Sequence, residues 1–95
     1  MITEITEDEK PHLIEEGYIE ELESRFAKVW FIQNPEISKM TFMLPRGNDQ
    51  AEQYFWQQMQ SKGFLSLLEA EGVMKGDILR IKSYYEGLED KYLLY

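Results

Sequence analysis

The chain has 95 residues, so it forms one domain, and a chain of this size buries only roughly 60–65% of the surface that it exposes when unfolded. Its 43% hydrophobic and 14% aromatic content excludes a disordered tail, and the absence of cysteine excludes disulfides and cysteine-rich zinc sites. No apolar run approaches the roughly 20 residues that span a bilayer, and the first residues are acidic where a signal peptide is basic. We therefore expect a cytoplasmic protein with no membrane partner.

The formal charge of −8 is concentrated at one end, because residues 1–23 hold nine acidic side chains and one lysine, whereas the remainder is balanced. The basic residues are dispersed, which argues against direct nucleic-acid binding. The glutamate-rich end has two interpretations, a solvated face and a docking site for a basic partner. We divide the chain into an acidic flexible lead-in, residues 1–12, and a single domain, residues 13–95.

The first part of that domain is ambiguous. Apolar residues recur at every fourth position between residues 13 and 26, as in a helix, but Gly17 interrupts them, and Ser24-Arg25 could form a turn between strands. Both interpretations stay open. Residues 26–32 are short and rich in aromatic and β-branched side chains, which predicts a largely buried strand.

Asn34-Pro35-Glu36 predicts the start of a helix, because Asn caps free amides, proline fits the first turn and glutamate suits the positive end of the helix dipole. Pro45 ends this helix, since it forces the preceding residue out of helical geometry. The residues expected on its inner side are Ile37, Met40 and Leu44.

A second helix follows the turn at Gly47, with either Asn48 or Asp49 as its cap. Glu52 would complete a capping box if Asp49 held that position. Gly63 ends the helix. The inward residues of this helix are predicted to be Ala51, Tyr54, Phe55 and Met59.

A third helix is predicted over residues 64–71, and Gly72 ends it with Val73 packing back on the helix. Its inward residues would be Phe64, Leu67 and Leu68.

The period then changes from helical to alternating. Lys75-Gly76-Asp77 forms a turn, and residues 78–85 alternate as a strand with one solvated side, which residues 86–90 could connect to a last strand over residues 92–95. The two faces would carry Leu79, Ile81 and Tyr85 on one side and Arg80, Lys82 and Tyr84 on the other. The sequence thus predicts an α+β fold, in which three consecutive short helices cover one face of a small mixed or antiparallel sheet.

The glycine spacing resembles that of a known family, the C-terminal domain of the Obg family of bacterial GTPases. In that family a helix ending in glycine precedes a short helix ending in glycine, a Gly-Asp turn and a strand reading Val-Arg-Ile or close to it. The resemblance covers roughly residues 18–85. The matching positions are Phe55, Gly63, Leu68, Gly72, Gly76, Asp77, Arg80 and Ile81.

The resemblance implies a function without catalysis. Family members place a glycine-rich domain and a GTP-binding domain ahead of this one, whereas this sequence has neither a phosphate-binding loop nor an Asn-Lys-x-Asp motif. The implied role is a regulatory or protein-interaction domain of a GTPase tied to ribosome assembly and stress signalling, with the GTPase domain in cis or a ribosome-associated factor as partner. The alternative is an independent small acidic adaptor that binds a basic protein.

Candidate chemistry is sparse. His12 has no nucleophile that its spacing nominates, so we expect a surface residue, and the acidic pairs lack the loop spacing of a calcium site. Asp77 reads as a turn-forming residue rather than a catalytic one. We predict no enzyme activity, metal or cofactor. Trp56, at the flank of its helix stripe, and Tyr84, on the outer face of its strand, are the candidate partner contacts.

Overall fold

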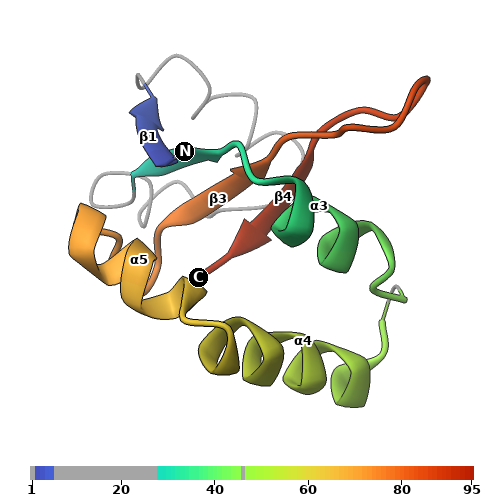
Figure 1. Ribbon diagram of the computed structural model, residues 1–95, viewed down its shortest axis with the longest axis horizontal. Coiled ribbons are helices and arrows are strands. Elements are labelled where there is room, and N and C mark those ends of the chain that lie inside the picture. Colours follow the sequence, from blue (N-terminus) through green and yellow to red (C-terminus); the bar gives the residue numbers. More distant parts are fainter. Residues whose placement is uncertain (1, 6–27, 46) are drawn as a thin grey trace.

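The computed structural model describes residues 2–5, 28–45 and 47–95, arranged as a small sheet with helices packed against it (Figure 1). His12 and both interpretations of residues 13–26 lie outside the described residues. The elements in chain order are β1 (Ile2–Ile5), β2 (Val29–Ile32), α3 (Pro35–Phe42), α4 (Asp49–Ser61), α5 (Phe64–Glu71), β3 (Ile78–Ile81) and β4 (Lys91–Leu94).

The four strands follow one another across the sheet in the order β1-β2-β3-β4. The β2–β3 pair is parallel, with Val29 opposite Ile78, whereas the two outer pairs are antiparallel. Parallel neighbours require a crossover connection, and α3, α4 and α5 together supply it. The predicted α+β fold with a mixed sheet is therefore confirmed.

The core lies between the helices and one face of the sheet. Alternate residues of β2 and β3 point to this face and meet apolar side chains of all three helices, and each of these residues is at most 8% exposed. The core cluster comprises Trp30, Ile32, Ile37, Phe55, Met59, Phe64, Leu68, Val73, Leu79 and Ile81. On the opposite face Val29 and Ile78 are also buried, at 2% and 1% exposure, so that face is not solvated along the whole of β3 as the sequence predicted.

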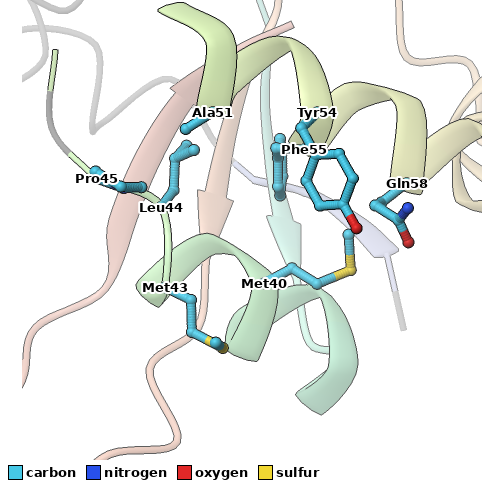
Figure 2. Close-up of a pocket in the computed structure, with 8 residues that line it drawn as sticks. All are labelled: Met40, Met43, Leu44, Pro45, Ala51, Tyr54, Phe55 and Gln58. Carbon is cyan, nitrogen blue, oxygen red and sulfur yellow. The ribbon is translucent and has the colours of Figure 1, made fainter. Parts of the chain in front are cut away.

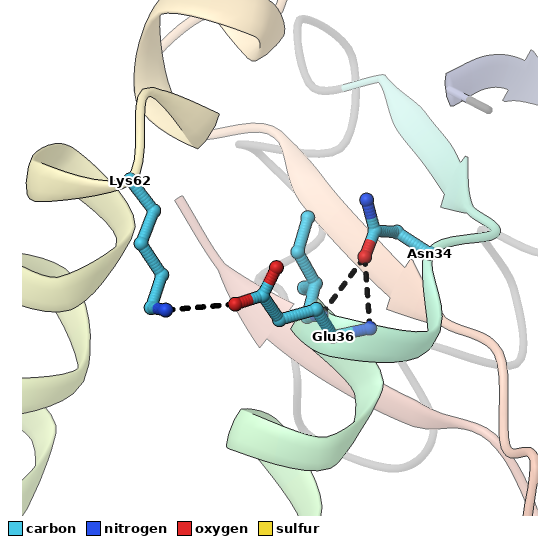
Figure 3. A network of polar contacts seen from close by, with 4 residues as sticks. Asn34, Glu36 and Lys62 are labelled. Atoms are coloured by element: carbon cyan, nitrogen blue, oxygen red, sulfur yellow. Dashed lines mark hydrogen bonds and ion pairs between the residues drawn. The ribbon is translucent and has the colours of Figure 1, made fainter.

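Asparagine caps begin α3 and α4. The Asn34 side chain accepts hydrogen bonds from the backbone N–H groups of Glu36 and Ile37 at 2.9 and 3.1 Å, as predicted (Figure 3). Asn48 accepts from the Ala51 N–H at 2.9 Å, which makes Asn48 the cap of α4 and rules out the capping box that required Asp49 in that position. α3 ends at Phe42, earlier than the proline signal indicated.

α4 and α5 end where the glycines predicted, but the prediction that Tyr54 and Leu67 point inward was wrong. Phe55 and Met59 of α4 and Phe64 and Leu68 of α5 are buried. Tyr54 is 61% exposed and Leu67 is 53% exposed. Each helix touches the core through a narrow stripe, and a residue adjacent in sequence to a buried one is rotated by about 100° away from it.

The predicted strand over residues 78–85 is shorter than expected, because β3 ends at Ile81. The Asp90 carboxylate accepts the Ser83 backbone N–H at 2.7 Å, and the Tyr85 ring packs against Phe42 with 5.3 Å between ring centroids. These contacts draw the chain out of the sheet. Tyr84 and Tyr85 therefore lie in the β3–β4 loop and not on opposite faces of a strand.

The lead-in predicted over residues 1–12 contains a strand. Residues 2–5 form β1 and pair with β2 in antiparallel register, with Ile2 opposite Ile32. The backbone hydrogen bonds of this pairing, and the contact of Ile2 with the core, are long-range features that a polar, aperiodic segment does not disclose.

Candidate functional site

Asp77 is a buried polar side chain of the matching motif with three hydrogen-bond donors around it. It is 4% exposed, and its carboxylate accepts hydrogen bonds from the Lys28 N–H at 3.0 Å, the Trp30 indole N–H at 3.0 Å and the Met74 N–H at 2.9 Å. The Asp77 backbone carbonyl also accepts the Tyr95 N–H at 2.9 Å. The side chain thus joins the start of β2 to the turn before β3, and the backbone carbonyl adds the residue after β4. Asp77 therefore has a structural role.

The turn before β3 requires a glycine. The Asp77 N–H donates to the Met74 carbonyl at 3.0 Å, and Gly76, the third residue of this turn, has φ 94°. This is the geometry of a type II turn, which favours glycine at that position. In the Gly-Asp pair of the motif, the glycine therefore allows the backbone conformation of the turn, and the Asp77 carboxylate stabilises the turn by accepting the Met74 N–H.

Gly72 ends α5 in a Schellman motif. Its N–H donates to Glu69, the Val73 N–H donates back to Leu68, both at 3.0 Å, and Gly72 itself has φ 102°. Val73 is 5% exposed and packs in the core, as the sequence predicted. Gly63, with φ 80°, occupies the corresponding left-handed position between α4 and α5.

The remaining motif residues are also structural. Phe55, Leu68 and Ile81 are core side chains that are at most 4% exposed. The Arg80 Nε lies 2.8 Å from an Asp90 carboxylate oxygen, so that Arg80 ties β3 to the end of the β3–β4 loop.

Trp56, one of the two predicted partner contacts, is partly buried at the edge of the core. Its ring makes edge-to-face contacts with Phe55 and Tyr95, at centroid distances of 5.0 and 5.9 Å. It also lines a shallow cavity of about 360 Å³ beside Glu69 and Leu94. Burial, and then the nearby Glu69 carboxylate, raise the pKa of the Tyr95 phenol above its usual 10.0. A contact of Trp56 with a partner stays a prediction.

Tyr84, the second predicted contact, is 45% exposed in the β3–β4 loop, and the Lys82 ammonium lies 5.0 Å from the centre of its ring. Trp56 and Tyr84 belong to different elements, and no contact between them brings the two into one site.

A groove between α3 and α4 was not predicted from the sequence. It encloses about 290 Å³, and Figure 2 shows side chains of the two helices facing it, with Met40 extending toward the Tyr54 ring. Met43, at the end of α3, is 69% exposed. The groove could not be predicted from the sequence, because the pattern did not show that Met43 and Tyr54 are exposed. The α3/α4 groove is lined by Met40, Met43, Leu44, Pro45, Ala51, Tyr54, Phe55 and Gln58.

The described residues contain no group of three or more His, Asp or Glu side chains that could hold a metal ion. None of the helices in the described part of the chain has the length and apolar character of a transmembrane span. Among the motif residues named from the sequence, Phe55, Leu68 and Ile81 pack in the core, whereas Asp77 and Arg80 bond residues outside the motif.

One family matches most of the chain. Its sequence pattern, described as a domain of unknown function (DUF1967), covers residues 15–86 and therefore includes β2, the three helices and β3, whereas β1 and β4 lie outside the match. Comparisons with curated proteins and with solved structures gave no match. On the strength of this family match, the chain belongs to the DUF1967 family, which is the C-terminal domain of Obg proteins.

Proposed function

We propose that this chain is a non-catalytic regulatory domain that acts by binding proteins, in the service of an Obg-type GTPase involved in ribosome assembly and stress signalling. The main support for the proposal is that the motif residues have structural roles, whereas other large side chains are exposed. The motif positions shared with the family build the scaffold, through glycine turns, core side chains and the Asp77 network. Large side chains remain exposed on that scaffold, such as Met43 and Tyr54 beside the α3/α4 groove.

The partner in this proposal is a GTPase domain in cis or a ribosome-associated factor, and the place of action is the cytoplasm. The chain itself contributes no nucleotide chemistry. Its sequence has no phosphate-binding loop, and α3, the helix that follows β2, begins at the Asn34 cap and not at a glycine-rich loop.

Isothermal titration calorimetry of the chain with GTP and Mg²⁺ tests the non-catalytic part. The proposal predicts no binding heat at millimolar nucleotide. A micromolar dissociation constant would refute it, because such an affinity requires a nucleotide site.

The second candidate, an acidic adaptor for a basic protein, is favoured by one observation, the excess of acidic residues in residues 1–23. Deleting this segment would also remove β1 and its pairing with β2, so loss of binding would be ambiguous. A better variant keeps residues 1–5 and replaces the acidic residues from 7 to 23 with their amides. Retention of a basic partner by that variant, in the same pull-down as the unmodified chain, would exclude the adaptor.

A further inference from the structure

Two aromatic rings form a corner between α4 and the residue that follows β4. The Trp56 and Tyr95 rings meet at nearly a right angle, with 79° between their planes and 5.9 Å between their centroids. Both rings line the shallow cavity of about 360 Å³. We call this cavity the Trp56 cavity, and its lining residues are Trp56, Leu65, Glu69, Lys75, Leu94 and Tyr95.

Both rings are held in place by the scaffold. The Trp56 ring packs edge-to-face on the buried Phe55 ring, with 5.0 Å between centroids. The Tyr95 backbone is fixed to the turn before β3, because its N–H donates to the Asp77 carbonyl at 2.9 Å and its carbonyl accepts the Gly76 N–H at 3.3 Å. Rings that are already in position reduce the conformational entropy that is lost when a ligand binds.

A carboxylate lies beside the two rings. After burial, Glu69 is the group that raises the pKa of the Tyr95 phenol, so its charge acts on the cavity wall. The last turn of α5 holds Glu69 and Glu71 and no basic residue, and the helix dipole adds negative potential at this end. Lys75 is exposed and lines the cavity too, so it offsets part of this charge.

We propose that the Trp56 cavity binds an arginine side chain of a partner protein. The guanidinium packs on the two rings and pairs with the Glu69 carboxylate, and its aliphatic stem lies on Leu65 and Leu94. Arginine is favoured over lysine, because a guanidinium is planar, is more weakly hydrated and binds a carboxylate through two N–H groups. The inference rests on the proposed protein-binding function and adds its site and the chemistry of its partner.

The charge of the whole chain agrees with a basic partner. A net charge of −8 speeds the approach of a positively charged protein and repels a nucleic acid. The cavity supplies what this long-range attraction lacks, which is a specific place for one cationic side chain.

NMR titration of the isotope-labelled chain tests the site with a short peptide in which arginine and glycine alternate. Matched peptides carry lysine, leucine, or citrulline, the neutral counterpart of arginine. The readout is the Trp56 indole N–H signal, and the reference is the buried Trp30 indole N–H, which donates to Asp77. We expect the arginine peptide to shift the Trp56 signal saturably without moving that of Trp30. The lysine peptide should bind more weakly, and the other two should not bind.

Two carboxylates in the last turn of α5 provide a matched pair of variants. Glu69→Gln should weaken binding of the arginine peptide about fivefold. Glu71→Gln removes the same charge from the same turn, but Glu71 lines a different cavity beside Ile2 and Phe64, so binding should be unchanged. Lys75→Gln should strengthen binding, because it removes a like charge from the Trp56 cavity.

The aromatic contribution has a conservative control. Tyr95→Leu should weaken peptide binding, whereas Tyr95→Phe, which keeps the ring, should retain it, and both keep the backbone bonds of this residue. Circular dichroism and the urea unfolding midpoint establish that each variant is folded. Equal binding of the arginine and citrulline peptides, a Trp56 shift caused by the leucine peptide, or equal effects of Glu69→Gln and Glu71→Gln would overturn the inference.

A parallel calorimetric titration with an Obg-type GTPase that lacks its own C-terminal domain separates this inference from the proposed function. If the unmodified chain binds the GTPase but the arginine peptide does not bind the Trp56 cavity, the site assignment fails and the proposed function stands. If arginine binding depends on Glu69 but the chain binds neither the GTPase nor ribosome-associated proteins, the proposed function fails and the site assignment stands.

Discussion

Replacement of Asp77 should destabilise this domain more than any exposed substitution, because one carboxylate accepts three N–H groups. The Trp30 indole is in a residue only 5% exposed, so removing its acceptor leaves a buried donor unpaired at about 1–3 kcal/mol. The Lys28 and Met74 backbone donors are partly buried, and water can replace some of their bonding. We expect Asp77→Ala to lower the free energy of unfolding by about 3 kcal/mol, and the melting temperature by roughly 10–20 °C.

The geometry also predicts a graded response. Trp30 and Met74 donate to the same carboxylate oxygen, Oδ2, whereas Lys28 donates to Oδ1. In Asp77→Asn the amide can keep its oxygen at the Oδ2 position and lose only the Lys28 bond, so its effect should be about half that of Asp77→Ala.

Urea unfolding followed by circular dichroism measures both variants, with Glu89→Gln in the exposed loop as the control for charge alone. A change below about 0.5 kcal/mol for Asp77→Ala, the range of ordinary surface substitutions, would refute the reasoning. So would an Asp77→Asn variant that is less stable than Asp77→Ala.

Three further predictions concern stability. Asn34→Ala should lower the free energy of unfolding by about 1 kcal/mol through loss of the α3 cap. Lys62→Gln should lower it by less than about 0.5 kcal/mol, because its ion pair joins side chains that are 40% and 53% exposed. Urea unfolding that shows a larger loss for Lys62→Gln than for Asn34→Ala would contradict this. Gly72→Ala should lower the free energy of unfolding by about 1–2 kcal/mol in the same assay, because alanine is strained at the φ of 102° that Gly72 adopts. An unchanged unfolding midpoint would contradict this. Because the pKa of Tyr95 is higher in the folded than in the unfolded state, the contribution of the neutral phenol to stability is complete below pH 10.0 and is lost as the pH rises further. The stability of the unmodified chain should therefore fall relative to Tyr95→Phe above that pH, and parallel pH profiles would contradict it.

Local chemistry was sufficient to predict the helices and the turn before β3. Asn34 and the glycines at the ends of α4 and α5 act within a few residues of themselves, so their signals are complete in the sequence. The side-chain period identified Phe55 and Leu68 as core residues but overestimated the width of the buried stripe on both helices.

Long-range contacts account for what the sequence missed. Asp77 receives the N–H groups of Lys28 and Trp30 across 49 and 47 residues, and no local pattern carries that information. β3 ends at Ile81 because Asp90 and Phe42 hold the following residues away from the sheet.

We propose that this domain acts on an Obg-type GTPase by binding and not by chemistry. Calorimetric titration of the chain into such a GTPase, from which the C-terminal domain has been removed, tests it most directly. We expect saturable binding of the folded chain to the GTPase. Absence of binding heat with the GTPase in its GTP-bound and GDP-bound forms and with ribosome-associated proteins alike, for a chain shown to be folded, would contradict it.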